Sequence, residues 1–142
     1  TSHVIVDVFG YMAPSSATGF TPSAPFRWVD TRSPWSLDLN FGTSGQRLGG
    51  GQVIAIQVAG QRGVPFSAKS VSFNVTAADG AADNGYVTAY PCGSPPPTSN
   101  LNFSAGKAVA NGAMVALSAT GSLCVYSSVA AHVIVDVNGW LG

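Results

Sequence analysis

The sequence predicts an all-β domain, an antiparallel β-sandwich of the jelly-roll or immunoglobulin-like kind, with a barrel as the alternative. Three observations predict this fold class. Short apolar runs recur at intervals of roughly ten residues, clusters of Gly, Pro, Asn and Asp separate them, and no segment has the apolar period of a helix. At 142 residues, the chain has the length of one domain with a substantial core.

The expected strands follow from local patterns along the chain. Residues 53–58 form a β-branched run that begins and ends near glycines. Residues 69–76 alternate strictly, which places Val71, Phe73 and Val75 on one face of a strand and polar side chains on the other. Further strands are expected at 86–90, 101–103, 113–117, 123–126 and 132–137.

The two ends of the chain nearly repeat each other. The sequence of residues 3–8 returns unchanged at 132–137, and in both copies a glycine and an aromatic residue follow shortly after. A strand that recurs after one domain's length indicates a tandem array. We therefore expect 1–12 to close a preceding copy, 13–25 to be a linker or long turn, and 26–142 to be the sandwich module. The alternative is a single domain that uses the same edge-forming segment twice.

Composition and charge exclude two classes of partner. Only 8% of residues are charged, no Glu is present, and six Lys and Arg balance six Asp. A neutral chain of this kind has neither the basic surface that binds nucleic acid nor a polybasic face for anionic lipid. No apolar run approaches the ~18 residues of a membrane span, so membrane insertion is not expected.

The two cysteines, Cys92 and Cys124, predict a disulfide. They do not form a C-x-x-C pair, and two ligands cannot make a zinc site. The alternative is two separate buried thiols. A disulfide would stabilise the fold by roughly 3–4 kcal/mol and would imply an extracytoplasmic, secreted or cell-surface location.

An ordered set of short motifs runs through the module. The motifs are Asp-Thr-Arg at 30–32, Gly-Val-Pro at 63–65, Phe-Asn-Val-Thr at 73–76, Gly-Tyr-Val-Thr at 85–88, Ser-Asn-Leu-Asn at 99–102, Val-Ala-Asn at 109–111 and Val-Ile-Val-Asp-Val-Asn-Gly-Trp at 133–140. Over about residues 20–141, this set resembles a repeat module of large secreted actinobacterial proteins. The resemblance implies an extracellular repeat or accessory role and assigns no catalytic residue.

No catalytic constellation or cofactor site is expected. The nucleophile-elbow, zinc-protease, P-loop and dinucleotide-binding motifs are all absent from the sequence. His132 and Asp136 share one strand face, but four strand residues separate them by roughly 13 Å, too far to hydrogen-bond. A hydrolase, the remote alternative, would need His132 close to a Ser and an Asp.

Two aspartates, Asp7 and Asp136, interrupt apolar strands. A carboxylate among Val and Ile needs a cationic partner, and Arg32 is the candidate, with Asp30 capping the turn before it. We expect a structural Arg32–Asp136 ion pair; the alternative is an aspartate that binds ligand on a shallow sheet face.

Aromatic residues supply the candidate ligand surface. Trp28 and Trp35 could form a platform that stacks on sugar rings, with Tyr90 as a further contact. The alternative is that a small sandwich buries its aromatic residues.

A weak calcium candidate comes from the oxygens of Asp79, Asp83 and Asn84, which sit around two glycines. Calcium takes six to eight oxygen ligands, and this loop offers three side chains, so turn chemistry explains the same residues.

These observations favour a non-catalytic extracellular module of a tandem-repeat protein, either adhesive or carbohydrate-binding, whose partner is a polysaccharide or another cell-surface ligand. The alternative is a purely structural repeat or filament subunit that assembles with neighbouring copies. In that case residues 3–9 would pair with a sheet edge of this module or of another chain.

Overall fold

The computed structural model describes residues 11, 13, 19–33 and 45–142, and within them the chain forms eight strands and no helix. The strands are β1 (Phe20–Asp30), β2 (Val53–Gln57), β3 (Ser70–Ala78), β4 (Gly85–Pro91), β5 (Leu101–Phe103), β6 (Val109–Ala116), β7 (Ser122–Ser127) and β8 (His132–Leu141). The all-β prediction is confirmed. No helix that could cross a membrane occurs in this part of the chain.

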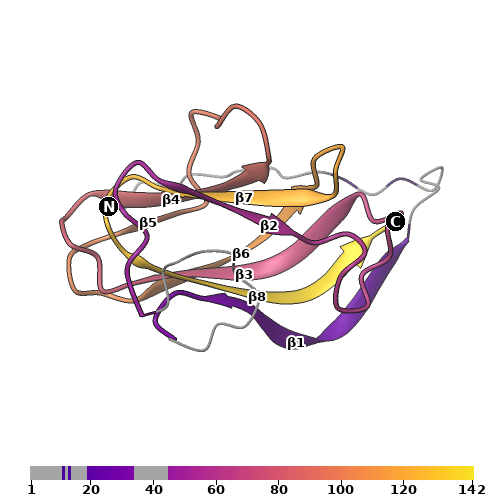
Figure 1. The fold of residues 1–142 in the computed structure, drawn as a ribbon, viewed down its shortest axis with the longest axis horizontal. Helices are drawn as coiled ribbons and strands as arrows, with labels where there is room; N and C mark the ends of the chain where they lie inside the picture. The colour runs from indigo at the N-terminus through magenta and orange to yellow at the C-terminus, as the bar shows by residue number, and fades with distance from the viewer. Residues whose placement is uncertain (1–10, 12, 14–18, 34–44) are drawn as a thin grey trace.

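The strands form two four-stranded sheets, in the orders β1-β8-β3-β6 and β2-β7-β4-β5. Figure 1 shows them as two layers, with β4, β7 and β2 above β3, β8 and β1. The first strand pairs with the last, the second with the seventh, the third with the sixth and the fourth with the fifth, always antiparallel. The chain is therefore one long folded hairpin wound across two sheets. This nesting is the jelly-roll arrangement, which confirms the sandwich and excludes the barrel and immunoglobulin-like alternatives.

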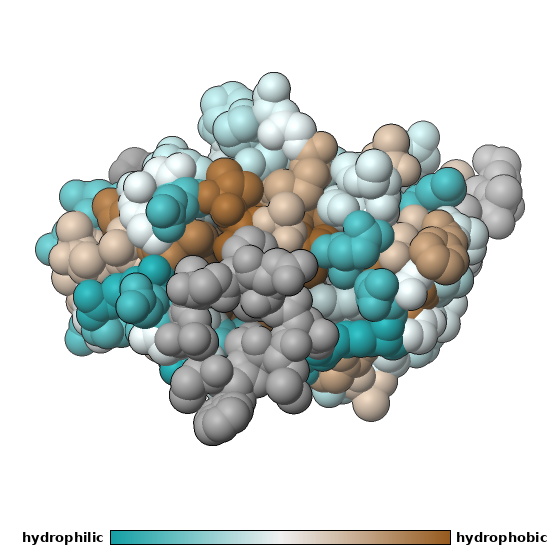
Figure 2. All heavy atoms as spheres, in the orientation of Figure 1, coloured by the Kyte–Doolittle hydropathy of each residue, from teal (hydrophilic) through white to brown (hydrophobic). Residues whose placement is uncertain are grey.

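The core fills the space between the two sheets. Val71, Phe73 and Val75 of β3 have no exposed surface, which confirms the face assigned from alternation. The opposite layer contributes inward-facing aliphatic side chains, namely Ile54 and Ile56 of β2, Val87 of β4 and Leu123 and Val125 of β7. Figure 2 shows that apolar and hydrophilic residues are interspersed on the face in view.

Strand β1 was not among the predicted strands. Residues 20–25, expected to be part of a linker, belong to β1, and residues 20–22 pair with the end of β8, starting from Phe20 opposite Leu141. Pro22 and Pro25, which suggested a linker, are compatible with β1, because it is an edge strand and needs no donor on its free side. The register shifts between Arg27 and Val29, so that Trp28 is an extra residue in a bulge.

The C-terminal copy of the repeated segment is β8, an interior strand bonded to both β1 and β3. It is therefore not an edge strand. Its Val133, Val135 and Val137 face the core and are almost fully buried. The N-terminal copy at residues 3–8 lies outside the described residues, so the tandem array and the capture of residues 3–9 remain predictions.

The disulfide prediction is confirmed. Cys92 and Cys124 are bonded, with their Cα atoms 4.8 Å apart, and no free cysteine remains. The proline-rich segment after β4 folds back over that strand, where the Thr88 hydroxyl donates to the Thr98 carbonyl at 2.5 Å. The Asn100 side chain accepts the Ala89 N–H at 2.6 Å. The disulfide and these bonds hold the segment against the sheet.

Candidate functional site

A row of polar side chains crosses the outer face of the β1-β8-β3-β6 sheet. Arg27 of β1 lies opposite Asp136 of β8, which in turn lies opposite Asn74 of β3. The Arg27 guanidinium donates from Nε to Asp136 Oδ1 at 2.8 Å and from NH2 to Oδ2 at 3.1 Å. Such two-point pairing fixes the orientation of both groups.

The predicted partner of Asp136 was wrong. Arg32 does not hydrogen-bond to Asp136; it folds back on Asp30, with Nε at 2.9 Å and NH2 at 2.8 Å from the two carboxylate oxygens. The reason is position, because Arg32 follows the end of β1, whereas Arg27 lies on the strand directly opposite Asp136. Asp30 also accepts the Arg32 backbone N–H at 3.1 Å, which confirms its expected capping role.

Asp30 links the two arginines into one cluster. Arg27 NH1 donates to Asp30 Oδ2 at 3.0 Å, so Arg27 contacts both aspartates. Hydrogen bonding from the Arg32 guanidinium holds the pKa of Asp30 below its ordinary value, although burial of the carboxyl opposes the shift. Hydrogen bonding to Asp136 raises the pKa of Arg27. The two arginines and two aspartates therefore form one continuous cluster of ion pairs.

A groove of about 540 Å³ lies beside this pair, and we call it the outer-face groove. It is lined by Pro25, Phe26, Arg27, Asn74, Asp136 and Asn138. Within the described part of the chain, the side chain of Asn138 has no hydrogen-bond partner, and that of Asn74 donates one hydrogen bond, to the Thr76 hydroxyl at 3.4 Å. The groove therefore offers unused amide donors and acceptors next to an aromatic ring and a proline.

Trp28 does not form part of the predicted aromatic platform. This side chain is only 5% exposed because the bulge turns it into the core, and the Arg62 guanidinium covers its ring at 5.4 Å from the centroid. Tyr90 is 3% exposed and has no open face either. Neither ring can stack on a sugar, so these two site predictions are wrong. Trp35 lies outside the described residues.

Two other aromatic features were missed in the sequence. Tyr86 and Tyr126 form a tilted pair on the outer face of the β2-β7-β4-β5 sheet, with ring centroids 5.8 Å apart. Hydrogen bonding with Tyr86 raises the pKa of Tyr126. Phe66, in the segment between β2 and β3, is 84% exposed. Alternation along 85–91 could have indicated the outward position of Tyr86, but no sequence signal distinguishes an exposed Phe66 from a buried one.

The three residues of the calcium candidate have structural roles. Asp79 pairs with Arg47, and Asp83 Oδ1 accepts the Ala105 N–H at 3.0 Å. Asp79 and Asn84 have positive φ angles of 52° and 59°, which Asp and Asn tolerate better than most residues. The conformations and hydrogen bonds of a turn thus explain these three residues, which was the alternative to a calcium site. No cluster of three or more metal-ligating His, Cys or Asp side chains occurs among the residues described.

His132 hydrogen-bonds to a threonine. Its Nδ1 lies 3.1 Å from the Thr31 hydroxyl, and that hydroxyl also accepts the Val133 N–H at 2.9 Å. Thr31 is 1% exposed, so its oxygen is buried in the link between β1 and β8. This arrangement stabilises the start of β8.

No family model and no curated protein sequence matches this chain.

Proposed function

We propose that this chain is a non-catalytic, carbohydrate-directed binding module of an extracellular protein, and that the outer-face groove is its binding site. The observation that carries the proposal is the set of hydrogen-bonding side chains in that groove. Asn74, Asp136 and Asn138 project from strands whose opposite faces form the core, beside Phe26. These polar groups are not needed to build the core.

The groove suits a sugar for two chemical reasons. Planar amide and carboxylate groups form paired hydrogen bonds to neighbouring hydroxyls, and amides both donate and accept. Arg27 holds Asp136 in one orientation, so little side-chain freedom is lost when a ligand binds. Phe26 and Pro25 supply an apolar wall against which the C–H face of a sugar ring can pack.

The disulfide and the fold support an extracellular binding role. A disulfide persists in oxidising compartments and is rare in reducing ones. Jelly-roll sandwiches recur in lectin domains and viral capsids, which agrees with a binding role, although a fold alone does not decide function.

The surroundings of His132 support the proposal that the module is non-catalytic. A general base must reach a nucleophile that the substrate can approach. The hydroxyl that His132 contacts belongs to Thr31, which is buried and already accepts a backbone hydrogen bond. This pair supports a structural role for the histidine.

A glycan array followed by calorimetric titration tests the proposal. The double substitution Asn74→Ala and Asn138→Ala should weaken binding of the best glycan at least about tenfold, which corresponds to roughly 1.4 kcal/mol, with little change in melting temperature. Asn102→Ala is the matched control, because Asn102 is an exposed strand asparagine on the other sheet. Binding that survives the double substitution would exclude the groove, and failure of the wild type to bind any glycan would exclude the function.

The alternative of a structural repeat remains a prediction. It depends on residues 3–9, which lie outside the described part of the chain. Size-exclusion chromatography of this protein and of a variant lacking residues 1–12 tests it, because assembly through the terminal strand requires that only the full chain oligomerises.

A further inference from the structure

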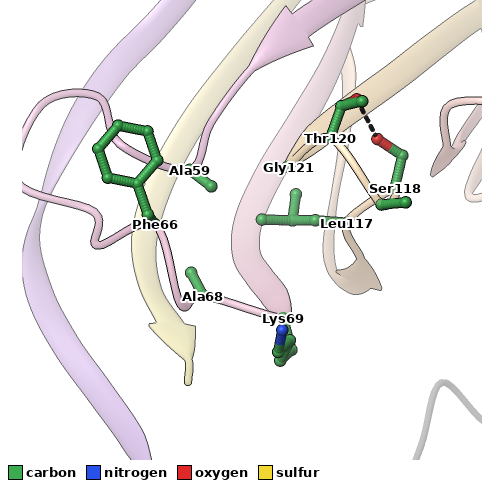
Figure 3. Close-up of a pocket in the computed structure, with 9 residues that line it drawn as sticks. Ala59, Phe66, Ala68, Lys69, Leu117, Ser118, Thr120 and Gly121 are labelled. Carbon is green, nitrogen blue, oxygen red and sulfur yellow. Dashed lines mark hydrogen bonds between the residues drawn. The ribbon is translucent and has the colours of Figure 1, made fainter.

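A second recess lies at one end of the sandwich, and we call it the end cleft. It has a volume of about 300 Å³ and lies between the segment that links β2 to β3 and the turn that links β6 to β7 (Figure 3). Its lining residues are Ala59, Phe66, Ala68, Lys69, Leu117, Ser118, Ala119, Thr120 and Gly121. None of them lines the outer-face groove.

Phe66 forms one wall of the end cleft and is held in place despite its exposure. A Cβ atom at Gly60 would lie 2.2 Å from Phe66 Cε1, so the ring rests directly on the glycine backbone. Gly60 has a φ of +79°, and its N–H donates to the Val64 carbonyl at 2.9 Å, which closes the turn under the ring. One edge of the ring is thereby positioned by the chain, while most of its surface stays open to solvent.

The opposite wall consists of hydroxyl groups in a fixed arrangement. Ser118 Oγ and Thr120 Oγ1 are 2.9 Å apart, as the dashed line in Figure 3 marks. Gln57 also holds this turn, since its Nε2 donates to the Thr120 carbonyl at 3.0 Å. Ser118 Oγ also accepts the Ser122 N–H at 3.1 Å, so the turn fixes the positions of both hydroxyls before any ligand arrives.

Lys69 gives the end cleft its charge. The side chain is exposed, and no carboxylate of the described residues lies within ion-pair distance of it. The four described arginines differ, because Arg27, Arg32 and Arg47 pair with aspartates and Arg62 covers Trp28. No Asp lines the cleft, so Lys69 is the one charged residue in its lining.

From these features we infer that the end cleft binds a sugar unit that carries a carboxylate, such as a uronic acid. The sugar ring would pack on Phe66, its hydroxyls would bond to Ser118 and Thr120, and its carboxylate would pair with Lys69. The inference concerns a site separate from the outer-face groove and does not depend on binding there.

Calorimetric titration with trigalacturonate and with its carboxyl-reduced, neutral counterpart tests this inference on the whole chain. The wild type should bind the acidic trimer at least about tenfold more tightly than the neutral one, and the preference should decline as salt is added. Lys69→Met should abolish the preference, and Phe66→Ala should weaken binding of both trimers. Lys107→Met is the matched control, because Lys107 is exposed and lies outside the cleft.

The outcomes separate this inference from the proposed function. Retention of trigalacturonate binding by the Asn74→Ala and Asn138→Ala variant would assign binding to the end cleft. Equal binding of the two trimers, an unchanged preference in Lys69→Met, or no binding at about 10 mM trimer would overturn the inference. Melting temperatures of the Phe66 and Lys69 variants should match the wild type, because both side chains are exposed.

Discussion

Replacing Asp30 with Asn keeps the shape of the side chain and removes its negative charge. Asp30 accepts hydrogen bonds from the side chains of both Arg27 and Arg32, and its own side chain is only 12% exposed. Hydrogen bonds to charged groups contribute about 1.5–3 kcal/mol each when buried. The arginine side chains are 50% and 48% exposed, so water replaces part of what is lost. We expect Asp30→Asn to lower the free energy of unfolding by about 2 kcal/mol.

The assay is thermal and urea unfolding at several pH values. For a chain of this length, a loss of about 2 kcal/mol lowers the melting temperature by roughly 7 °C at pH 7. The pKa of Asp30 is lowered in the fold, so its contribution is complete well above its ordinary value of 3.8 and declines as the pH falls below that value. The difference between variant and wild type should therefore be constant between about pH 5 and 8 and shrink in stronger acid.

Asp79→Asn is the control for this experiment. Asp79 also pairs with an arginine, but its side chain is 59% exposed, and its φ of 52° suits Asn. Its effect should stay below about 1 kcal/mol. A melting temperature of Asp30→Asn equal to that of the wild type at pH 7 would refute the reasoning, because it would show that the carboxylate is effectively solvated.

Three further predictions concern stability. A double-mutant cycle of Arg27→Met and Asp136→Asn should give a coupling free energy of about 1 kcal/mol in urea unfolding. A coupling near zero would mean that the ion pair does not contribute to stability. Replacing Cys92 and Cys124 together by Ala should cost about 3–4 kcal/mol, seen as a melting temperature roughly 10 °C lower; thiol titration of the denatured, unreduced wild type should find no free thiol. Phe73→Ala should cost about 3–5 kcal/mol in urea unfolding because Phe73 is fully buried, and a loss below about 1 kcal/mol would contradict its place in the core.

Much of the fold could be predicted because a two-residue period has a direct physical meaning. The alternation in 69–76 gave the buried face of β3, and turn residues gave the spacing of most strands. The predicted linker failed over 20–25 because Pro indicates a break in regular structure, whereas an edge strand tolerates it. Whether a strand lies at an edge depends on the sheet order, which local sequence does not contain.

The candidate site was harder to predict for a related reason. The alternation of side chains along β1 places Arg27 on the outer face. The bulge at Trp28 then interrupts this alternation and turns the Trp28 side chain inward, and no local residue pattern marks the bulge. Arg32 was chosen as the partner of Asp136 because a carboxylate in an apolar strand needs a cation. Pairing depends on which residues lie opposite one another in β1 and β8, and that register is set by tertiary packing.

Strand β8 connects the core of the module with its proposed site. Val133, Val135 and Val137 fill the core, while Asp136 and Asn138 lie on the outer-face groove. A one-residue slip of β8 would place the carboxylate in the core and the valines in water, so the Asp136–Arg27 pair and the valine row specify the same register. Substitutions at the inner positions should therefore alter folding, and those at Asn138 should alter binding alone. The groove is consequently built by the same strand register that builds the core.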